Sequence, residues 1–450
     1  MQRRTFVKNA SLALGGGMLP LAALAPAAGA ASASAGAATS TAASATRGLA
    51  TTLKAADWTQ LREMFALSQE YVHLATFLLA SHPKPVAEAI ERHRHGFDVN
   101  PVEYYYMNAA AMDEAIAAAA AEYMGGRPDQ VAMTDSTTMG LAMVASGLML
   151  RPDDEVLHSE HDHYAMEQSF QLRAERTGAR IRRVSLYDTP AEASVDQILS
   201  RLRAAITPAT RVVAMTWVHS YSGVKLPIHA IGEMVAELNS TRDEADHILY
   251  LVDGVHGFGI EDIDVPSVGC DFFVAGTHKW LFGPRGTGVI WGSDRGWAHC
   301  RPVVPSFGAY YGVWLGYITR DQVPVGDYMT PGGFHAFDHR WALPEAFQLH
   351  LQLGKANVQQ RIHELNTLTK EGLLEIDGVT LHTPLSPELS SGMVCFDYRD
   401  LDPGEVMGGL YGQGIIASTT PYRRSYARFA PSLINNEEEI ERALAALASL

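Results

Sequence analysis

The stretch that decides the fold is residues 248–291, which read ILYLVDGVHGFGIEDIDVPSVGCDFFVAGTHKWLFGPRGTGVIW. Its first five residues, 248–252, form an apolar run rich in β-branched and aromatic side chains, which predicts a buried strand ending at Asp253. A second apolar run, 270–275, is followed by Lys279 and then by the turn-forming sequence Gly-Pro-Arg-Gly. The sequence therefore places a carboxylate at the end of one strand and a lysine just after another.

Asp253 and Lys279 are the pair of residues that a pyridoxal phosphate site requires. A lysine amine forms a Schiff base with the aldehyde of this cofactor, and a carboxylate keeps the pyridine nitrogen protonated, so that the ring accepts electrons from a substrate carbanion. The spacing alone also fits a structural pair, because an Asp often ends a strand as a turn residue and a Lys before a turn is often solvated. The residues of the surrounding sequence motifs favour the cofactor site.

Three motifs carry a resemblance to a known family: Asp-Gly-Val-His at 253–256, Gly-Thr-His-Lys-Trp at 276–280 and Gly-Pro-Arg-Gly-Thr-Gly at 283–288. Together they resemble the class V aminotransferases, which are fold-type I pyridoxal phosphate enzymes. His256 and the His-Lys-Trp wording are most similar to the isopenicillin N epimerase branch. The resemblance runs patchily from about residue 71 to the C-terminus, and it implies pyridoxal 5'-phosphate as the cofactor and a homodimer with active sites at the subunit interface.

An α/β fold is expected from the order of the elements. Repeated alternation of strand and helix predicts a mainly parallel sheet with helices on both faces, and the chemistry of such sheets gathers at the carboxyl ends of the strands. With the resemblance, this indicates a fold-type I transferase with a mainly parallel, seven-stranded-type sheet and a smaller α/β C-terminal domain. The expected parts are an N-terminal segment that packs on the small domain, 49–110, a large cofactor-binding domain, 111–330, and the small domain, 331–450.

A hydroxyl-rich turn lies between an expected strand at 131–134 and an expected helix at 139–150. Free backbone N–H groups at the start of a helix, joined by hydroxyl donors, form a site for phosphate. An ordinary Ser or Thr N-cap uses the same residue types. The resemblance favours the phosphate site and assigns the cofactor phosphate to Ser136, Thr137 and Thr138.

Other contacts with the cofactor follow from the resemblance. Relatives often have Ser three residues before the Schiff-base lysine, where this chain has Gly276, so Thr277 and His278 are expected to contact the phosphate instead. Ser220, in a loop after an expected strand, is a candidate donor to the phenolic oxygen of the cofactor. His256 is the other candidate for that oxygen.

Two histidines, His161 and His163, follow an expected strand at 155–159. In class V relatives a ring from this loop stacks on the pyridine face, which holds the plane of the cofactor and limits water at the reacting carbon. The resemblance assigns this role to His163, with His161 as second choice. No third ligand stands at a recognisable spacing, so no metal site is expected.

Arg428 resembles the arginine that pairs with the substrate α-carboxylate in class V enzymes, where a planar guanidinium binds a carboxylate through two parallel hydrogen bonds. Arg423 and Arg424 are candidates for recognising a second acidic group. A cysteine desulfurase needs a nucleophilic Cys on the loop before this arginine, and residues 418–421 read Ser-Thr-Thr-Pro. Desulfuration is therefore not expected, because the cysteines lie elsewhere, at Cys270, Cys300 and Cys395. Their odd number and unpaired spacing indicate no disulfide framework.

The N-terminus has the pattern of an export signal. Residues 3–8, Arg-Arg-Thr-Phe-Val-Lys, match the twin-arginine (Tat) pattern, and an apolar run covers about 10–28. Its glycines and prolines make this run a poor permanent membrane span. The expected boundaries are a signal peptide at 1–33 and a low-complexity linker at 34–48. This predicts a periplasmic enzyme that is exported folded through the Tat translocon and has no stable membrane anchor.

The composition is that of an ordinary globular protein, with 47% hydrophobic and 19% charged residues and a formal net charge of −15. Removal of a signal peptide at 1–33 would take away three cations and no acids, so the mature chain is more acidic still. Such a charge argues against nucleic acid or an anionic membrane as a partner.

The expected activity is at the Cα of an amino acid or of the N-terminal residue of a peptide, with epimerase or aminotransferase chemistry. Lys279 would move the Cα proton. The residues named so far do not choose among epimerisation, transamination, decarboxylation and oxidation, and the acid or base on the second face is not identified. Two alternatives stay open: a periplasmic enzyme that modifies a glutamate of a pyoverdine siderophore precursor, and a catalytically inactive fold-type I binding protein.

Overall fold

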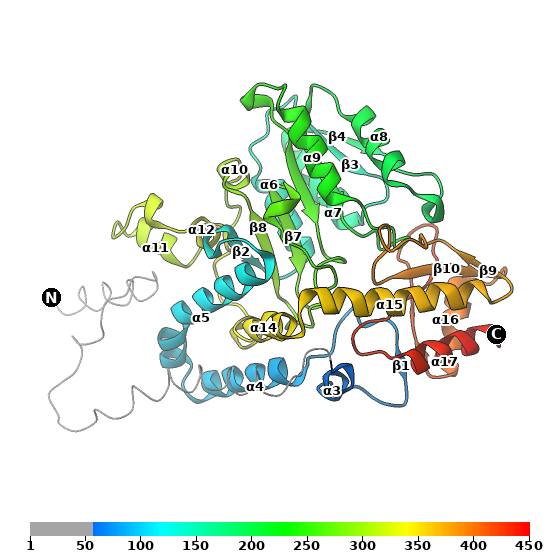
Figure 1. The fold of residues 1–450 in the computed structure, drawn as a ribbon. Helices are drawn as coiled ribbons and strands as arrows, with labels where there is room; N and C mark the ends of the chain where they lie inside the picture. Colours follow the sequence, from blue (N-terminus) through cyan, green and yellow to red (C-terminus); the bar gives the residue numbers. More distant parts are fainter. Residues whose placement is uncertain (1–56) are drawn as a thin grey trace.

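A seven-stranded sheet forms the centre of the large domain in the computed structural model, which describes residues 57–450. The expected signal peptide and linker lie outside this range. The strand order is β2-β8-β7-β6-β5-β3-β4 (Figure 1). Strands β7, β6, β5, β3 and β4 run parallel, while β8 is antiparallel to both of its neighbours. The strands are β2 (Val131–Thr134), β3 (Glu155–Ser159), β4 (Arg180–Val184), β5 (Thr210–Thr216), β6 (Leu249–Asp253), β7 (Phe272–Gly276) and β8 (Gly288–Gly292). The expected mainly parallel α/β fold is confirmed.

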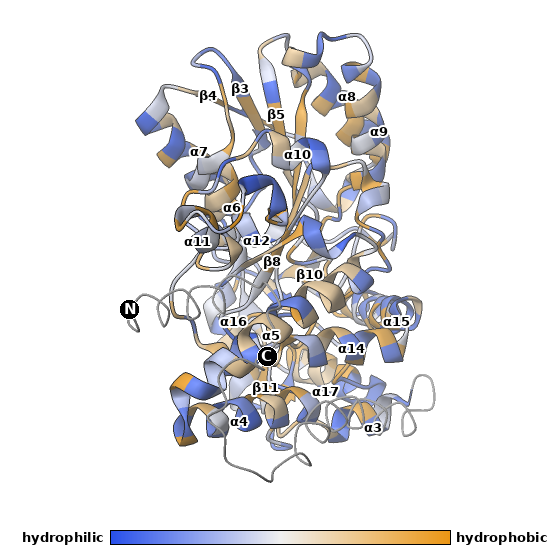
Figure 2. Ribbon diagram, turned by 90° about the vertical axis from the view of Figure 1, so that its left-hand side faces the viewer, coloured by the Kyte–Doolittle hydropathy of each residue, from blue (hydrophilic) through white to orange (hydrophobic). Residues whose placement is uncertain are grey.

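Strand β6 explains why the strands read as continuous apolar runs. Leu249 and Leu251 pack into one hydrophobic core, whereas Tyr250 and Val252 pack into another. Both cores are closed, because helices cover both faces of the sheet, so successive side chains are buried on opposite sides. Figure 2 shows hydrophobic residues along these strands and more hydrophilic residues on the outer helices.

The helices of the large domain divide between the two faces of the sheet. The core on one face contains residues of α6 and α7, and the core on the other contains residues of α5, α8 and α9. Short helices follow β8 and return the chain to the start of the sheet, where α12 contacts β2. The bounds are α5 (Pro101–Met124), α6 (Thr137–Gly147), α7 (Tyr164–Thr177), α8 (Val195–Ala205), α9 (Ile228–Asn239), α10 (Asp294–Ala298), α11 (Ala309–Trp314) and α12 (Val325–Met329).

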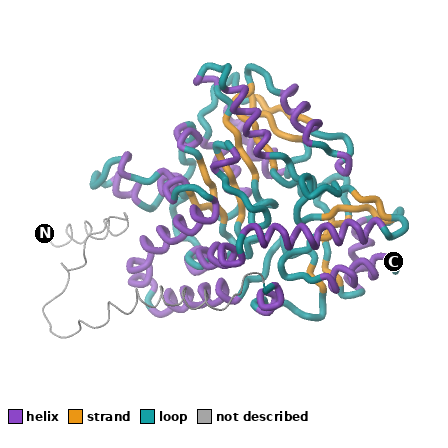
Figure 3. Tube along the Cα trace, in the orientation of Figure 1, coloured by secondary structure: helices purple, strands orange, loops and turns teal. Residues whose placement is uncertain are grey.

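The smaller domain has its own antiparallel sheet, in the order β12-β13-β10-β9, and its own hydrophobic core. Figure 3 shows these strands apart from the large sheet, with the long helix α15 running beside them. The elements are α15 (Lys355–Leu374), β9 (Val379–Leu381), β10 (Val394–Tyr398), α16 (Pro403–Gly412), β11 (Ile415–Ile416), β12 (Ser418–Thr419), β13 (Ala427–Phe429) and α17 (Glu437–Ala448).

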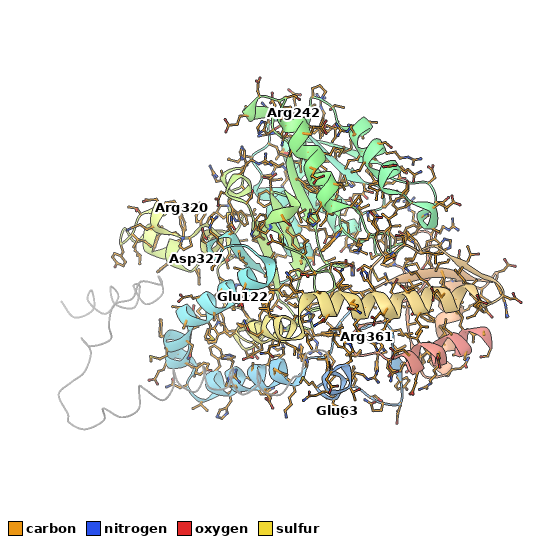
Figure 4. The ribbon with its side chains drawn as sticks, viewed as in Figure 1. Glu63, Glu122, Arg242, Arg320, Asp327 and Arg361 are labelled. Carbon is orange, nitrogen blue, oxygen red and sulfur yellow. The ribbon has the colours of Figure 1, made fainter. Side chains whose placement is uncertain are left out.

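Arg361 fastens α15 to the start of α17. Its guanidinium donates to both carboxylate oxygens of Glu437, at 2.5 and 3.2 Å, and to the carbonyl of Asn435. Figure 4 shows Arg361 on α15. The side chain is buried, and this pairing lowers the pKa of Glu437 to about 2, with the hydrogen bond from Arg361 as the main cause. The two helices are thereby held against each other over the small domain.

The N-terminal segment divides between two neighbours instead of packing on the small domain alone. Helix α3 (Trp58–Glu63) carries Arg62, which pairs with Glu439 of α17, and β1 (Val72–His73) pairs in parallel with β11. Helix α4 (Lys84–Val99) instead contacts α5, α13 (Phe337–Arg340) and α14 (Leu343–Leu353). Residues just after position 331 therefore pack beside the large domain, and the chain enters the small sheet only after α15.

Helix α5 is 24 residues long and alanine-rich in its second half. It begins at Pro101, a residue that suits the first turn of a helix, and ends before Gly125 in the left-handed conformation. Within residues 57–450, no helix is both long enough and apolar enough to cross a membrane.

Candidate active site

A cavity of about 150 Å³ lies at the carboxyl ends of the parallel strands. It brings together the residues that the sequence assigns to the cofactor and to the substrate α-carboxylate as first choices, except Thr277. The lining residues that were predicted are Ser136, Thr137, Thr138, His163, Ser220, Asp253, His256, His278, Lys279 and Arg428. All but Arg428 follow the ends of five strands of the large sheet, β2, β3, β5, β6 and β7, which a parallel arrangement gathers at one edge. Arg428 comes from β13 of the small sheet.

Asp253 ends β6, and the backbone holds it firmly at the sheet edge. Its carbonyl accepts from the N–H of Trp217, and the following N–H donates to Val274, so both neighbouring strands fix its position. The carboxylate Oδ1 accepts from the N–H of Val255 at 3.2 Å. The side chain is 2% exposed, and burial raises the pKa of Asp253 to about 7. A cationic partner would therefore stabilise the ionised carboxylate.

Lys279 follows β7 and projects its amine into the cavity. Its Nζ lies 3.4 Å from Nε2 of His256. The turn after the lysine is tight, since Phe282 adopts a positive φ of 57° and the N–H of Gly283 bonds back to the carbonyl of Thr277. Burial lowers the pKa of Lys279 to about 8. About one-tenth of this amine is therefore neutral at pH 7, far more than for an ordinary lysine, and the neutral form is the one that acts as a nucleophile or proton acceptor.

The start of α6 forms one end of the cavity. Ser136 is the N-cap of this helix and accepts from the N–H of Met139 at 3.2 Å, so the capping role and the cavity-lining role occur together. The hydroxyl of Thr137 accepts from the N–H of Gly276 at 2.8 Å. A Cβ at Gly276 would lie 3.0 Å from that hydroxyl and 3.1 Å from the ring of His278. The absence of a side chain there keeps this end open for a phosphate.

Thr277 does not face the cavity. Its hydroxyl is fully buried and forms a hydrogen bond with the hydroxyl of Thr287, which belongs to the turn before β8. Of the two residues expected to replace the usual Ser contact, only His278 lines the cavity. Thr277 instead supports the turn that carries the lysine.

His163 lines the cavity and His161 does not. His163 is the N-cap of α7, and its Nδ1 accepts from the N–H of Ala165 at 3.3 Å. Burial lowers the pKa of His163, which keeps the ring neutral. The ring of His161 stacks on Tyr187 at 3.9 Å, so the two histidines diverge. Within the described residues no cluster of His, Cys, Asp and Glu has the arrangement of a metal site.

Asp162, between these histidines, ties two strand ends together and was not predicted. One carboxylate oxygen accepts from the N–H of Ser159 and the other from the N–H of Thr216, at 2.8 and 3.0 Å. Burial alone would raise the pKa of Asp162, but the contacts of its carboxylate with His158 and His219 outweigh burial and lower it. The loop that carries His163 is thus anchored between β3 and β5.

Arg428 is 1% exposed and lies on β13 of the small domain. Its guanidinium donates to the hydroxyl of Ser418 and to the carbonyls of Ser220 and Thr419, at 3.1, 2.7 and 3.2 Å. The ring of Phe77 lies 4.4 Å from its central carbon. These contacts orient the guanidinium into the cavity, and the five N–H groups of an arginine leave capacity for an anionic ligand. Arg423 and Arg424 do not line the cavity.

Sequence patterns did not point to Phe77 and Thr216, which line the cavity, or to Tyr422, which contacts the lining residue Ser220. Phe77 lies between β1 and α4, and it lines the cavity beneath Arg428. Thr216, the last residue of β5, also lines the cavity, and its buried hydroxyl has no hydrogen-bond partner within residues 57–450. Tyr422 donates to or accepts from the hydroxyl of Ser220 at 2.7 Å. Only the aromatic and hydroxyl character of these positions was visible in the sequence.

The residues of the cavity fit pyridoxal phosphate. The N-terminus of α6 would hold the phosphate, Asp253 the pyridine nitrogen, and Ser220 or His256 the phenolic oxygen, while Lys279 supplies the amine. The unpartnered hydroxyl of Thr216 is a buried polar group that a bound polar molecule would satisfy. The fold and the site together define a fold-type I pyridoxal-phosphate-dependent enzyme.

The chain belongs to the aminotransferase class V family, whose sequence profile matches residues 80–421. Among curated relatives, the isopenicillin N epimerase of Streptomyces clavuligerus is 27% identical over 411 residues, covering 88% of this chain and 99% of that protein. A probable cysteine desulfurase of Xylella fastidiosa strain 9a5c is 29% identical over 415 residues, covering 87% of this chain and 95% of that protein. The expected family is therefore confirmed.

Solved structures show the same fold. A lysine mutant of C-DES with glycine covalently linked to its PLP cofactor superposes with a TM-score of 0.76 at 22% identity, covering 86% of this chain and 99% of that one. The apo cysteine desulfurase from Thermococcus onnurineus has a TM-score of 0.74 at 18% identity, with coverage of 87% and 97%.

We predict that Asp253→Asn stabilises the cofactor-free protein at high pH. The folded-state pKa of Asp253, about 7, is above the unfolded value of about 4, so its contribution to stability is fully present below about pH 4 and is lost as pH rises through about 7. At about pH 8 the variant should gain about 1–3 kcal/mol over wild type. Urea unfolding at several pH values measures this difference.

The difference should disappear near about pH 4, where both side chains are neutral. Added pyridoxal phosphate should reverse the order at about pH 8, since only the carboxylate gains from a protonated pyridine nitrogen. A wild-type protein that is as stable as the variant at all pH values, with and without cofactor, would contradict the placement of this carboxylate.

Proposed function

We propose that this chain is an epimerase-type enzyme that exchanges the Cα proton of an amino acid or of the N-terminal residue of a peptide. The observation that carries the proposal is the convergence of Lys279, His256 and Arg428 on the cavity that Asp253 closes. Similarity to isopenicillin N epimerases from two organisms supports it. Transamination at the same carbon is the second candidate, because it uses the same first proton transfer.

Each cavity residue has a separate role in the proposed exchange of the Cα proton. Bound pyridoxal phosphate supplies the electron sink for the Cα bond that breaks. Arg428 binds the substrate carboxylate and so fixes which Cα bond faces Lys279. Lys279, with its lowered pKa, accepts the Cα proton and returns it. Asp253 holds the proton of the pyridine nitrogen, and His163 shields the opposite side from water.

Epimerisation also needs a proton donor on the side away from Lys279. Lys279 follows β7 and Ser220 follows β5, with β6 between them in the sheet, and both residues line the cavity. Ser220 is hydrogen-bonded to Tyr422, whose ring lies 6.3 Å from that of His163. Burial raises the pKa of Tyr422 to about 12, so its hydroxyl keeps a proton at neutral pH. We assign the second proton transfer to this pair of hydroxyls.

The cysteines support this proposal against a desulfurase. Cysteine desulfurases form a persulfide on a nucleophilic thiolate, and all three cysteines of this chain are buried. None lines the cavity. Burial raises the pKa of Cys270, and it raises those of Cys300 and Cys395 to about 12. Such thiols are neutral and inert near pH 7.

A panel of L-amino acids and short peptides in deuterated buffer tests the function. Wild type should exchange the Cα hydrogen of one substrate class for deuterium and invert its configuration, as measured by NMR and chiral chromatography. Tyr422→Phe should keep the exchange at the Lys279 side and lose at least about 10²-fold in inversion. Lys279→Ala should lose both reactions.

Other outcomes separate the candidates. Formation of an oxo acid, with no inversion of the remaining amino acid, would favour the aminotransferase, and loss of the carboxyl group would favour decarboxylation. A protein that binds cofactor but exchanges no Cα hydrogen in the panel would overturn the proposal and favour a binding protein.

We further propose that the enzyme is periplasmic and homodimeric. The twin-arginine pattern at 3–8 supports export, although it lies outside the described residues. Several large apolar side chains are exposed: Leu78, which lines the cavity, at 51%, and Phe334 and Trp314 elsewhere on the surface at 81% and 73%. Exposed apolar surface of this kind supports a subunit interface.

One preparation tests location and assembly. The tagged full-length protein should be recovered from the periplasmic fraction, and Arg3→Lys with Arg4→Lys should leave it in the cytoplasm. Sedimentation of the exported protein should give twice the monomer mass. A cytoplasmic wild-type protein would contradict export, and a monomer that remains active would contradict the assembly.

A further inference from the structure

Trp280, directly after the lysine, contacts His256 rather than the cavity. Its indole N–H donates to Nδ1 of His256 at 3.3 Å, and the indole is 1% exposed. The Trp280 ring stacks on Phe77 with centroids 5.7 Å apart, and Phe77 meets His256 edge-on at 5.6 Å. The indole is thereby fixed in the one orientation that directs its N–H at the imidazole.

This contact determines which nitrogen of His256 carries the proton. An indole N–H can only donate, so Nδ1 of His256 must be an acceptor without a hydrogen. Burial lowers the pKa of His256 well below its ordinary value, which keeps the ring neutral. A neutral imidazole has one N–H, and it must then be on Nε2, the nitrogen that lies 3.4 Å from Nζ of Lys279.

The Nε2–H group discriminates between the two forms of Lys279. A neutral amine has a lone pair that accepts from Nε2–H, whereas an ammonium has only donors and would face another donor. Other charges act on the same amine: Asp253 favours the ammonium, and Arg428 opposes it. His163 and His278, which also line the cavity, have lowered pKa values and stay neutral. Among these influences on the pKa of Lys279, the one that can change without a change of charge is which ring nitrogen of His256 carries the hydrogen.

We propose that Trp280 is a positioning residue, which holds His256 in the Nε2–H tautomer and thereby favours the neutral, nucleophilic form of the Lys279 amine. Trp280 acts through His256 and does not itself contact substrate. The proposal rests on Lys279 as the reactive amine, and it is independent of the reaction that follows at Cα.

The variant Trp280→Phe tests the proposal, because it keeps an aromatic ring and removes the N–H. His256 can then take the Nδ1–H tautomer, in which Nε2 accepts from the ammonium of Lys279. The pKa of Lys279 should rise by about one pH unit. Competitive acylation of the full chain after removal of the cofactor, followed by peptide mass spectrometry over a range of pH, measures this pKa without any enzymatic turnover.

Trp341→Phe is the matched control. Trp341 is also a buried tryptophan, at 2% exposure, but its indole nitrogen has no hydrogen-bond partner among the described residues. The Trp341→Phe substitution should leave the pKa of Lys279 unchanged. In a His256→Ala background Trp280→Phe should likewise have no further effect, since the coupling requires the imidazole. Uptake of added pyridoxal phosphate verifies that each variant is folded.

A second measurement uses the wild-type protein and does not depend on the folding of a variant. The experiment is ¹⁵N NMR of protein that carries ¹⁵N in its histidine rings, with the signals of His256 assigned by comparison with His256→Gln. The spectrum should show that Nε2 of His256 is protonated and that Nδ1 is not. An Nδ1–H tautomer in wild type overturns the proposal. So does a Lys279 pKa that is the same in Trp280→Phe as in wild type. Failure of the Cα-exchange experiment with these results intact would count against the proposed reaction alone.

Discussion

The site depends on a carboxylate that is buried before anything binds to it. Asp253 lies at the end of a strand that is covered on both faces, so its charge is costly without a cationic partner. The neighbouring amine of Lys279 is also shifted toward its neutral form by burial. A protonated pyridine nitrogen would supply the missing positive charge for Asp253, and an aldehyde would react with the neutral amine. Burial of these two groups is unfavourable in the cofactor-free protein. Binding of the cofactor would relieve this unfavourable free energy and so would contribute to the affinity.

The packing around the site serves to hold these groups in place. Asp162 ties two strand ends through backbone N–H groups, Trp280 orients the ring of His256, and Phe77 lies against both Trp280 and Arg428. Arg428 comes from the small domain, yet it donates to the carbonyl of Ser220 in the large one. Any movement of the small domain would therefore move Arg428, the residue that we propose binds the substrate carboxylate, and would couple domain position to substrate orientation.

The sequence was most informative where a function depends on a local pattern. The run before Asp253 and the turn after Lys279 predicted two strand ends correctly, and the strand alternation predicted the parallel sheet that brings them together. It was less informative where position depends on contacts between distant segments. Thr277 was expected at the phosphate, but the hydroxyl of Thr287 on the next turn takes it away from the cavity. Phe77 and Tyr422 reach the site only through the tertiary fold, so no spacing in the chain could reveal them. The N-terminal segment is divided between two domains for the same reason.

The central claim is that Lys279 is the residue that binds pyridoxal phosphate covalently. The most direct measurement is borohydride reduction of the purified cofactor-loaded protein, followed by peptide mass spectrometry. We expect a pyridoxyl group on Lys279 and on no other lysine, and no labelled peptide from Lys279→Ala. A label on a different lysine, or a protein that takes up no cofactor, would contradict the account.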